Sequence, residues 1–237
     1  MANWLKWLGG GKEDSASKLD PPDAAAQRNE RGRLDDLAAW DSLKASGPLP
    51  KKVTRAQLEK MLTARGFRKK RVDPDVCFLK DMPDRVVFLW VRLKTFGHEG
   101  HYAPSQRLTL SANICTPEYA AAEAEVMGDP DRQLVTMAGT GELRFKEFIL
   151  TAERAEDIFD EVQAKAIAID PVALLAQFRG YDPSRPGADG LKHLCALALA
   201  GDVDTLDGYV RRRMANDPCG FVPFITDEMI ARAAKIG

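Results

Sequence analysis

The sequence predicts an α+β fold in which an antiparallel sheet is flanked by helices and followed by a helical C-terminal segment. Segments with the period of a β-strand occur one after another between residues 76 and 149. Helical periodicity dominates from Thr151 to the C-terminus, and the chain shows no β-α-β alternation. With 237 residues, the chain is long enough to bury a substantial hydrophobic core.

Residues 1–50 are predicted to form an N-terminal arm, a linker and a helix. Residues 9–32 hold glycines, prolines and charges but few apolar side chains, so we expect a linker there. Residues 33–45 carry an apolar stripe at helical spacing. The predicted helix ends before Gly47 and the two prolines that follow it.

Residues 51–150 are predicted to form an α+β sheet domain. Its first helix begins at a capping box made by Thr54 and Gln57, and Gly66 supplies the signal that ends it. Residues 76–80 then have the composition of a strand. The domain therefore opens with one helix and continues into consecutive strands.

Residues 85–95 are apolar on both alternations of a strand, which predicts a central strand covered on both faces. Residues 107–115 alternate between apolar and polar side chains, which predicts a strand buried on one face only. A helix is expected over 116–127, because a threonine N-cap is followed by proline and glutamate. Two further strands are expected over 133–138 and 142–149.

Residues 151–237 are predicted to form a helical segment that packs on the sheet domain. Apolar stripes indicate a helix from Thr151, another that begins at Asp170 and a terminal helix from Thr226. The stretch "LKHLCALALAGDVDTLDGYV" is similar to one unit of a helical repeat, but no second copy follows at a fixed period. We therefore expect a single helical hairpin in this stretch.

Charge, cysteine content and hydropathy limit the class of protein. Lys and Arg total 34 against 35 Asp and Glu, so the basic excess of a dedicated nucleic-acid-binding protein is missing. The four cysteines lie in apolar surroundings without C-x-x-C spacing, which indicates core residues and a cytoplasmic location. No apolar run reaches the ~20 residues of a membrane span, and no motif indicates a cofactor.

Two runs of cations interrupt this neutral composition. Arg68–Arg71 are consecutive and are expected in the connection that leads to the first strand. Arg211–Arg213 are expected on a helix. We expect both runs to be solvated surface. The alternative is a nucleic-acid or membrane-surface adaptor that also uses Trp4 and Trp7 of the N-terminal arm.

The histidines offer the nearest approach to catalytic or metal-binding chemistry. His98, Glu99 and His101 lie in one loop, and with help from elsewhere they could hold a metal ion or serve a hydrolytic enzyme. Their spacing is not H-E-x-x-H, and we expect a solvated loop without a metal. His193 is expected opposite the apolar face of its helix. No catalytic or metal-binding residue is therefore assigned.

The helix from Thr151 carries an acidic face. Its members, on the side opposite the apolar stripe, are Glu153, Glu156, Asp157 and Asp160. Such a face is commonly only solvated. The functional alternative is that these carboxylates bind a basic protein partner such as a nuclease, because complementary charge speeds the encounter. They are the candidate partner-binding residues.

Two stretches resemble uncharacterised bacterial proteins. "LEKMLTARGFRKKRVDPDVCFLK" is similar to the opening of an α+β domain family with an L-x-x-x-G-F-x-K-K start. "LALAGDVDTLDGYV" with "GFVPFITDEMIARA" is similar to the tail of related proteins. Such families are often encoded near polymorphic toxin and immunity genes. The resemblance implies a cytosolic immunity protein that occludes a cognate toxin, with no enzyme activity and no functional residues to carry over.

Overall fold

The computed structural model describes residues 22–72, 75–97, 102–132, 134–185 and 189–237. The chain divides into two compact units, of which the first contains residues 1–49 and 97–104. The described helix of this unit is α1, Pro22–Ala45. It includes the predicted helix over 33–45 but begins earlier. The prediction of a linker over 9–32 is therefore wrong for residues 22–32. The rest of the predicted linker, residues 9–21, lies outside the described residues. Alanine, glutamine, glutamate and arginine, which favour helices, outweigh the missing apolar stripe in residues 22–32.

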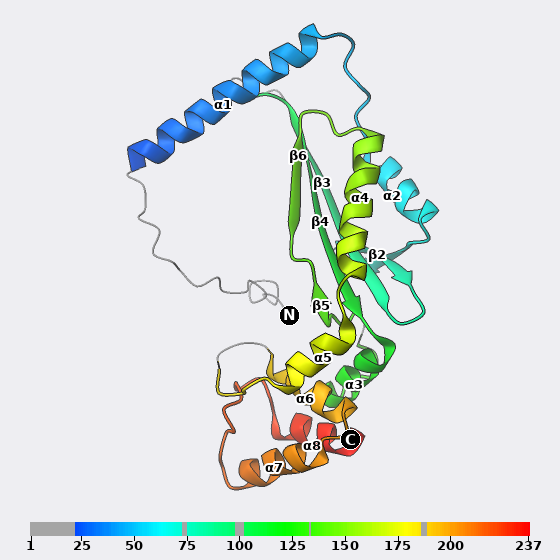
Figure 1. The fold of residues 1–237 in the computed structure, drawn as a ribbon, viewed down its shortest axis with the longest axis vertical. Coiled ribbons are helices and arrows are strands. Elements are labelled where there is room, and N and C mark those ends of the chain that lie inside the picture. The colour runs from blue at the N-terminus through cyan, green and yellow to red at the C-terminus, as the bar shows by residue number, and fades with distance from the viewer. Residues whose placement is uncertain (1–21, 73–74, 98–101, 133, 186–188) are drawn as a thin grey trace. The chain divides into compact units, whose positions relative to one another are not determined.

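The second unit, residues 50–96 and 105–237, contains a six-stranded sheet in which every pairing is antiparallel. Neighbouring strands follow the chain from β1 to β4, and β5 and β6 both pair with the outer side of β4 (Figure 1). The strands are β1 Arg68–Val72, β2 Asp75–Asp81, β3 Val86–Phe96, β4 Ser105–Cys115, β5 Ala138–Gly139 and β6 Leu143–Glu147. With the helices described below, this confirms the predicted α+β class.

The structure confirms the strands predicted over 76–80, 85–95, 107–115 and 142–149, and it corrects two other predictions. The strand expected over 133–138 is reduced to β5. The cations of Arg68–Arg71 form β1 itself, where a connection was expected. Charged side chains suit an edge strand because they stay in solvent and oppose pairing with another chain.

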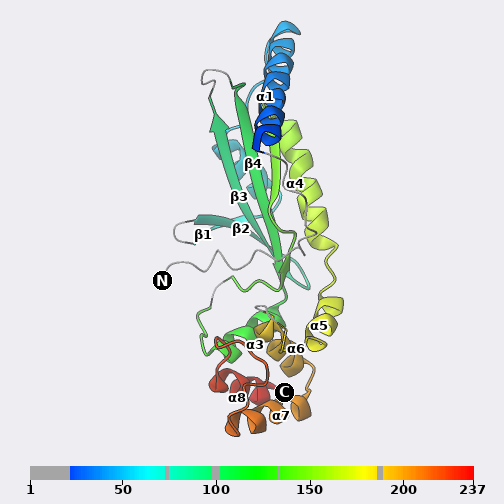
Figure 2. The same ribbon diagram turned by 90° about the vertical axis from the view of Figure 1, so that its left-hand side faces the viewer.

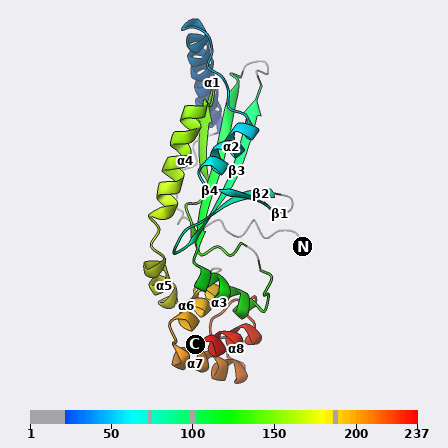
Figure 3. The same ribbon diagram turned by 90° about the vertical axis from the view of Figure 1, so that its right-hand side faces the viewer.

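One face of the sheet is covered by α2, Arg55–Ala64, and α4, Ala152–Ile167 (Figures 1 and 3). Both helices begin at a threonine N-cap, and the predicted capping box of Thr54 and Gln57 is present. Their apolar side chains pack against the side chains of β3 and β4 that point to the same face, including Leu89 and Leu110. This layer is the first of two hydrophobic clusters in the unit.

The second hydrophobic cluster joins the end of the sheet to the remaining helices (Figure 1). It contains Cys77, Leu79 and Phe88 from β2 and β3, together with apolar side chains of the helices. These helices are α3 Pro117–Met127, α5 Pro171–Arg179, α6 Gly190–Leu199, α7 Val203–Met214 and α8 Asp227–Ile236. The hairpin of α6 and α7 confirms the predicted single helical hairpin.

Strand β3 is covered on both faces over only half of its length. Val87, Phe88 and Leu89 are buried, as the apolar pattern predicts. Beyond Trp90, the face opposite α2 and α4 is exposed. The helices of the second cluster pack only at the beginning of β3, so an open sheet face remains beside its far half.

A buried glutamine holds the two covering helices in place. Gln106 of β4 is 2 % exposed and points to the covered face. Its side-chain Nε2 donates a hydrogen bond to the Val53 carbonyl at 3.1 Å, and its Oε1 accepts one from the Leu150 N–H at 3.1 Å. The Val53 N–H also donates to the Leu150 carbonyl at 2.8 Å. Val53 and Leu150 each lie immediately before the N-cap of a covering helix.

Replacing Gln106 by Met should destabilise the fold by about 3 kcal/mol, because the Val53 carbonyl and the Leu150 N–H lose their side-chain partner in a buried place. Urea unfolding of the full chain measures the effect. The same exchange at Gln177, which is exposed on α5, is the control and should change stability by less than about 0.5 kcal/mol. Equal stability losses for both variants would contradict the role given to Gln106.

Candidate binding surfaces

The cations of β1 are largely paired within the molecule. The Arg68 guanidinium donates from Nε and Nη2 to the two carboxylate oxygens of Asp81, at 3.1 Å each. The Lys69 ammonium donates to Glu59 at 2.8 Å, and this hydrogen bond lowers the pKa of the Glu59 carboxyl. The run is thus the ion-paired edge of the sheet, in agreement with the expectation that its role is structural.

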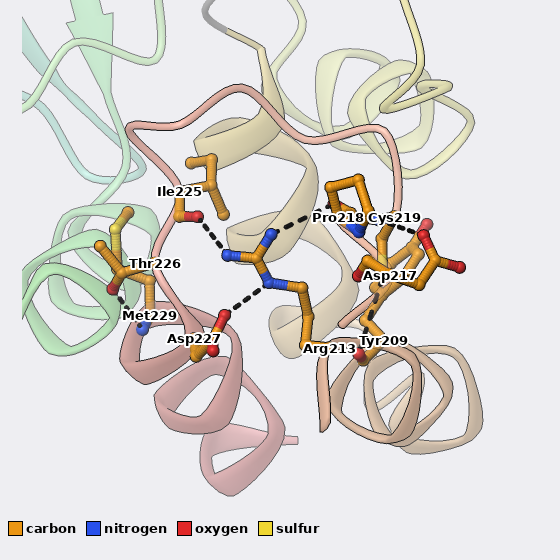
Figure 4. A network of polar contacts seen from close by, with 9 residues as sticks. All are labelled: Tyr209, Arg213, Asp217, Pro218, Cys219, Ile225, Thr226, Asp227 and Met229. Atoms are coloured by element: carbon orange, nitrogen blue, oxygen red, sulfur yellow. Dashed lines mark hydrogen bonds and ion pairs between the residues drawn. The ribbon is translucent and has the colours of Figure 1, made fainter. Parts of the chain in front are cut away.

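The second run, on α7, also serves the fold (Figure 4). Arg213 donates to Asp227 at the start of α8, and to the carbonyls of Ile225 and Pro218, at 2.5, 3.2 and 3.4 Å. Arg212 donates to Asp217 at 2.7 Å and lowers the pKa of that carboxyl. These contacts tie α7 to the segment that leads into α8. They leave Arg211 as the member of the run without a hydrogen bond or ion pair in the described chain.

The acidic face of α4 is partly neutralised. Arg65, the C-cap residue of α2, forms ion pairs with Glu156 and, at 2.8 Å, with Asp160. Glu153 and Asp157 are exposed on the same helix, and no cation of the described residues pairs with either. The four predicted carboxylates therefore lie on one helix, but only two of them have no cationic partner in the described chain.

The loop with His98, Glu99 and His101 lies outside the described residues. Elsewhere in the described chain, no cluster of three or more His, Cys, Asp or Glu side chains is arranged to hold a metal ion. No helix among the described residues is both long and apolar enough to cross a bilayer.

His193 corrects a prediction, because it is 2 % exposed and does not face solvent. Helix α6 is buried on nearly all sides, so the side opposite its apolar stripe is also interior. The His193 Nδ1 lies 2.9 Å from the Phe178 carbonyl, which can only accept, so Nδ1 carries the proton. The Tyr209 hydroxyl then donates to Nε2 at 3.0 Å. Both ring nitrogens are occupied in holding α5, α6 and α7 together.

The cysteines are core residues, as predicted. All four are buried and none forms a disulfide. Burial raises the pKa of Cys115 to about 12 and shifts that of Cys195 in the same direction. Thiols of this kind stay protonated at neutral pH and are poor nucleophiles.

Five cations gather on the open face of the sheet, across three adjacent strands. Their strands are β3, β4 and β6, and all five side chains are exposed. The members of this cationic sheet face are Arg92, Lys94, Arg107, Arg144 and Lys146. Because alternate residues of a strand point to one side, these positions share the face opposite α2 and α4.

The register places like charges directly opposite each other. Lys94 of β3 is opposite Arg107 of β4, which is opposite Lys146 of β6. In the next row, Arg92 and Arg144 flank Thr109. Like charges at directly opposed positions destabilise a sheet. The arrangement of like charges therefore lowers the stability of the fold. A surface with a purely structural role gains nothing from such an arrangement.

Most of these cations have no carboxylate partner in the described chain. Arg92, Lys94 and Arg107 form no ion pair with any residue in the described ranges. Arg144 pairs with Glu142, which lies just before β6. The positions of β3, β4 and β6 that point to this face include no aspartate or glutamate. The local charge is thus strongly positive although the chain as a whole is nearly neutral.

Aromatic side chains and a cavity adjoin the cationic sheet face. Phe96 is 42 % exposed, and the Arg107 guanidinium lies 5.3 Å from the centre of its ring. The cavity, of about 250 Å³, is lined by Trp90, Arg92, Thr109, Ser111 and Glu142, and also by residues of α2 and β2, among them Arg55, Glu59 and Phe78. Strand β2 stops pairing with β3 at Trp90, and the β1–β2 hairpin turns away from the long strands (Figure 2).

Comparison with known proteins gives a family without an assigned function. Residues 54–237 match the family of unknown function DUF6990. The chain belongs to this family. The matched range contains the whole sheet and helices α2 to α8, so both the acidic face and the cationic sheet face are parts of the family's domain. No curated protein and no solved structure matches the chain.

Sequence reasoning missed the cationic sheet face because its members are scattered from residue 92 to residue 146. A usable signal was present in "WVRLKTF", where Trp90, Arg92, Lys94 and Phe96 alternate with other residues. The same alternation recurs in "LRFKE" of β6. The apolar residues of the same stretch predict a strand covered on both faces, and this prediction does not separate the polar positions of its second half.

Burial of His193 makes stability depend on pH. Burial lowers the pKa of His193 below the roughly 6.5 of an exposed imidazole. Below about pH 6.5 the unfolded chain therefore binds a proton that the folded chain does not, and the free energy of unfolding falls as pH drops toward the folded-state pKa. His193→Gln should remove this slope. Urea unfolding between pH 7.5 and about pH 5 measures it, and an unchanged slope would contradict the assignment.

Proposed function

We propose that this chain is a non-catalytic protein that binds nucleic acid. Its cationic sheet face would contact the phosphates of the nucleic acid. The observation that carries the proposal is the in-register placement of like charges across β3, β4 and β6. A chain of phosphates supplies anions at regular spacing and relieves this repulsion. Neutralised phosphates release counterions, which provides much of the affinity of such complexes.

The near-neutral composition argues against a dedicated nucleic-acid-binding protein, but the relevant quantity is the local field. The cations of β1 and α7 are mostly used in intramolecular pairs, whereas Arg92, Lys94 and Arg107 have no carboxylate partner in the described chain. Alternate residues of a strand lie roughly 6.6 Å apart, and neighbouring strands lie about 4.8 Å apart. The cations thus form a compact patch that several successive phosphates of one strand can contact.

The double variant R92E/K94E should lose nucleic-acid binding. For the wild type, four phosphate contacts predict a slope of roughly −3 in log K against log salt concentration with single strands. The variant should bind at least about tenfold more weakly, with a smaller slope. Fluorescence anisotropy with a labelled oligonucleotide at several salt concentrations measures both.

The control reverses two exposed cations elsewhere, in K60E/K235E, and changes the net charge by the same amount. It should bind like the wild type. R92E/K94E should be at least as stable as the wild type, because the carboxylate introduced at position 94 would face Arg107 as an opposite charge. Equal binding by both double variants, or no oligonucleotide binding by the wild type, would refute the proposal.

A second candidate function is occlusion of a cognate bacterial toxin in the cytoplasm, as an immunity protein. Two carboxylates on α4, Glu153 and Asp157, support it because they have no cationic partner among the described residues. A basic protein such as a nuclease would complement them. The ion pairs of Arg65 with Glu156 and Asp160 weaken this surface, because half of its charge is already compensated.

E153K/D157K should abolish capture of a basic toxin encoded beside the gene, if occlusion uses this face. Co-expression with that toxin measures protection, and pull-down measures the complex. The matched control D204K/D207K reverses two acidic residues on α7 and should protect like the wild type. Protection that survives E153K/D157K would exclude the acidic face as the docking surface.

A further inference from the structure

The sheet has one covered face and one open face, and the open face has the features of a surface for unpaired bases. Helices α2 and α4 pack on the covered side. On the open side, exposed cations stand beside the aromatic side chains of Phe96 and Trp90. Surfaces that bind single strands combine cations along the backbone with aromatic rings on which bases stack. In a duplex the bases are stacked on each other, so their faces are not available to such rings.

Phe96 is placed to stack with a base. It is the last residue of β3, it is 42 % exposed, and Arg107 lies beside its ring. The aromatic ring and the guanidinium plane are both surfaces on which a base can stack. A large apolar ring at this point gains little from the fold, because neither hydrophobic cluster includes it.

The cavity beside Trp90 suits a single base. Its volume of about 250 Å³ lies below the roughly 300–1,000 Å³ of pockets for drug-sized ligands. Trp90, which is half-buried, lines it with Thr109, Ser111 and Glu142, and residues of α2 and β2 complete the lining. Arg92 lies at the same cavity, so a phosphate attached to the bound nucleotide would meet a cation there.

We propose that the cationic sheet face binds single-stranded nucleic acid, with one base in the cavity beside Trp90 and another stacked on Phe96. This inference rests on the proposed binding of phosphates to that face, and it adds the form of the ligand. The two aromatic rings lie on the same side of β3, with Arg92 and Lys94 between them. A nucleic-acid strand that runs along β3 would therefore place one base at Trp90 and another at Phe96, with its phosphates beside Arg92 and Lys94.

Glu142 gives the cavity a preference among bases. A carboxylate only accepts hydrogen bonds, and in recognition by proteins it accepts from the exocyclic amino group of cytosine. Glu142 lines the cavity and forms an ion pair with Arg144. Bases with an amino group at that edge should bind better than thymine or uracil, which present a carbonyl oxygen to the carboxylate.

The test compares single-stranded oligo(dC), oligo(dT) and a duplex of equal phosphate number, with the full chain. Oligo(dC) should bind at least about tenfold more tightly than the duplex at one salt concentration, because base stacking contributes beyond the phosphates. Oligo(dC) should also bind more tightly than oligo(dT), and Glu142→Gln should reduce that difference. Phe96→Ala should weaken oligo(dC) binding about tenfold without changing the salt slope.

A control variant and a crosslinking experiment accompany this test. The control detects loss of binding caused by misfolding, and the crosslinks identify the residues in contact with the nucleic acid. Met214→Ala, which truncates an exposed apolar side chain on α7, is the control for Phe96→Ala and should bind like the wild type. Ultraviolet crosslinking of bound oligo(dC), followed by mass spectrometry, should attach nucleotide to Trp90 or Phe96. Crosslinks confined to other residues would overturn the inference, even if Phe96→Ala binds weakly.

The outcomes separate this inference from the proposed function. Equal affinity for single strands and duplex, with equal salt slopes and no effect of Phe96→Ala, would overturn the single-strand assignment and leave phosphate binding intact. No binding to any oligonucleotide would overturn both. Vesicles of phosphatidylserine and phosphatidylcholine provide the comparison with an anionic membrane, and binding to vesicles but not to oligonucleotides would also overturn both.

Discussion

The hydrogen bonds of one buried side chain determine which face of the sheet is available. Gln106 projects from β4 and joins the segments that precede α2 and α4, through Val53 and Leu150. Each partner is a backbone group that would otherwise lie unpaired in a place without water. With both helix starts fixed to one side of β4, the helices cover that side. The opposite side of the same strands is left for the second cluster at one end and for solvent at the other.

The cations of the molecule have two kinds of surroundings in this arrangement. Arg65, Arg68 and Arg213 each have carboxylate partners and connect elements of the fold. Exposed pairs of this kind contribute little stability individually, but they fix geometry. On the open face, by contrast, cations are opposed to cations. A surface that is slightly unfavourable in the free protein and becomes favourable with an anionic partner is the usual compromise between stability and function.

The helices at the end of the sheet form a layer held by apolar packing and a few buried polar contacts. His193 bridges Phe178 and Tyr209, and Arg213 anchors the segment before α8. The thiols of this layer are buried and protonated. These groups hold the helices to one another. The exposed cations and the exposed aromatic ring that suit binding lie on the sheet.

The sequence alone determined the fold class, four of the strands, the capped starts of α2 and α3, and the burial of the cysteines. These features follow from local rules: alternation along a strand, periodicity along a helix and a threonine that can cap it. Only the tertiary structure decided that β1 is a strand, that His193 is interior, and that cations of β3, β4 and β6 lie in rows. The reason is that a row across a sheet is set by the register between strands, and residues as far apart as Lys94 and Lys146 become close through Arg107 only after the strands pair.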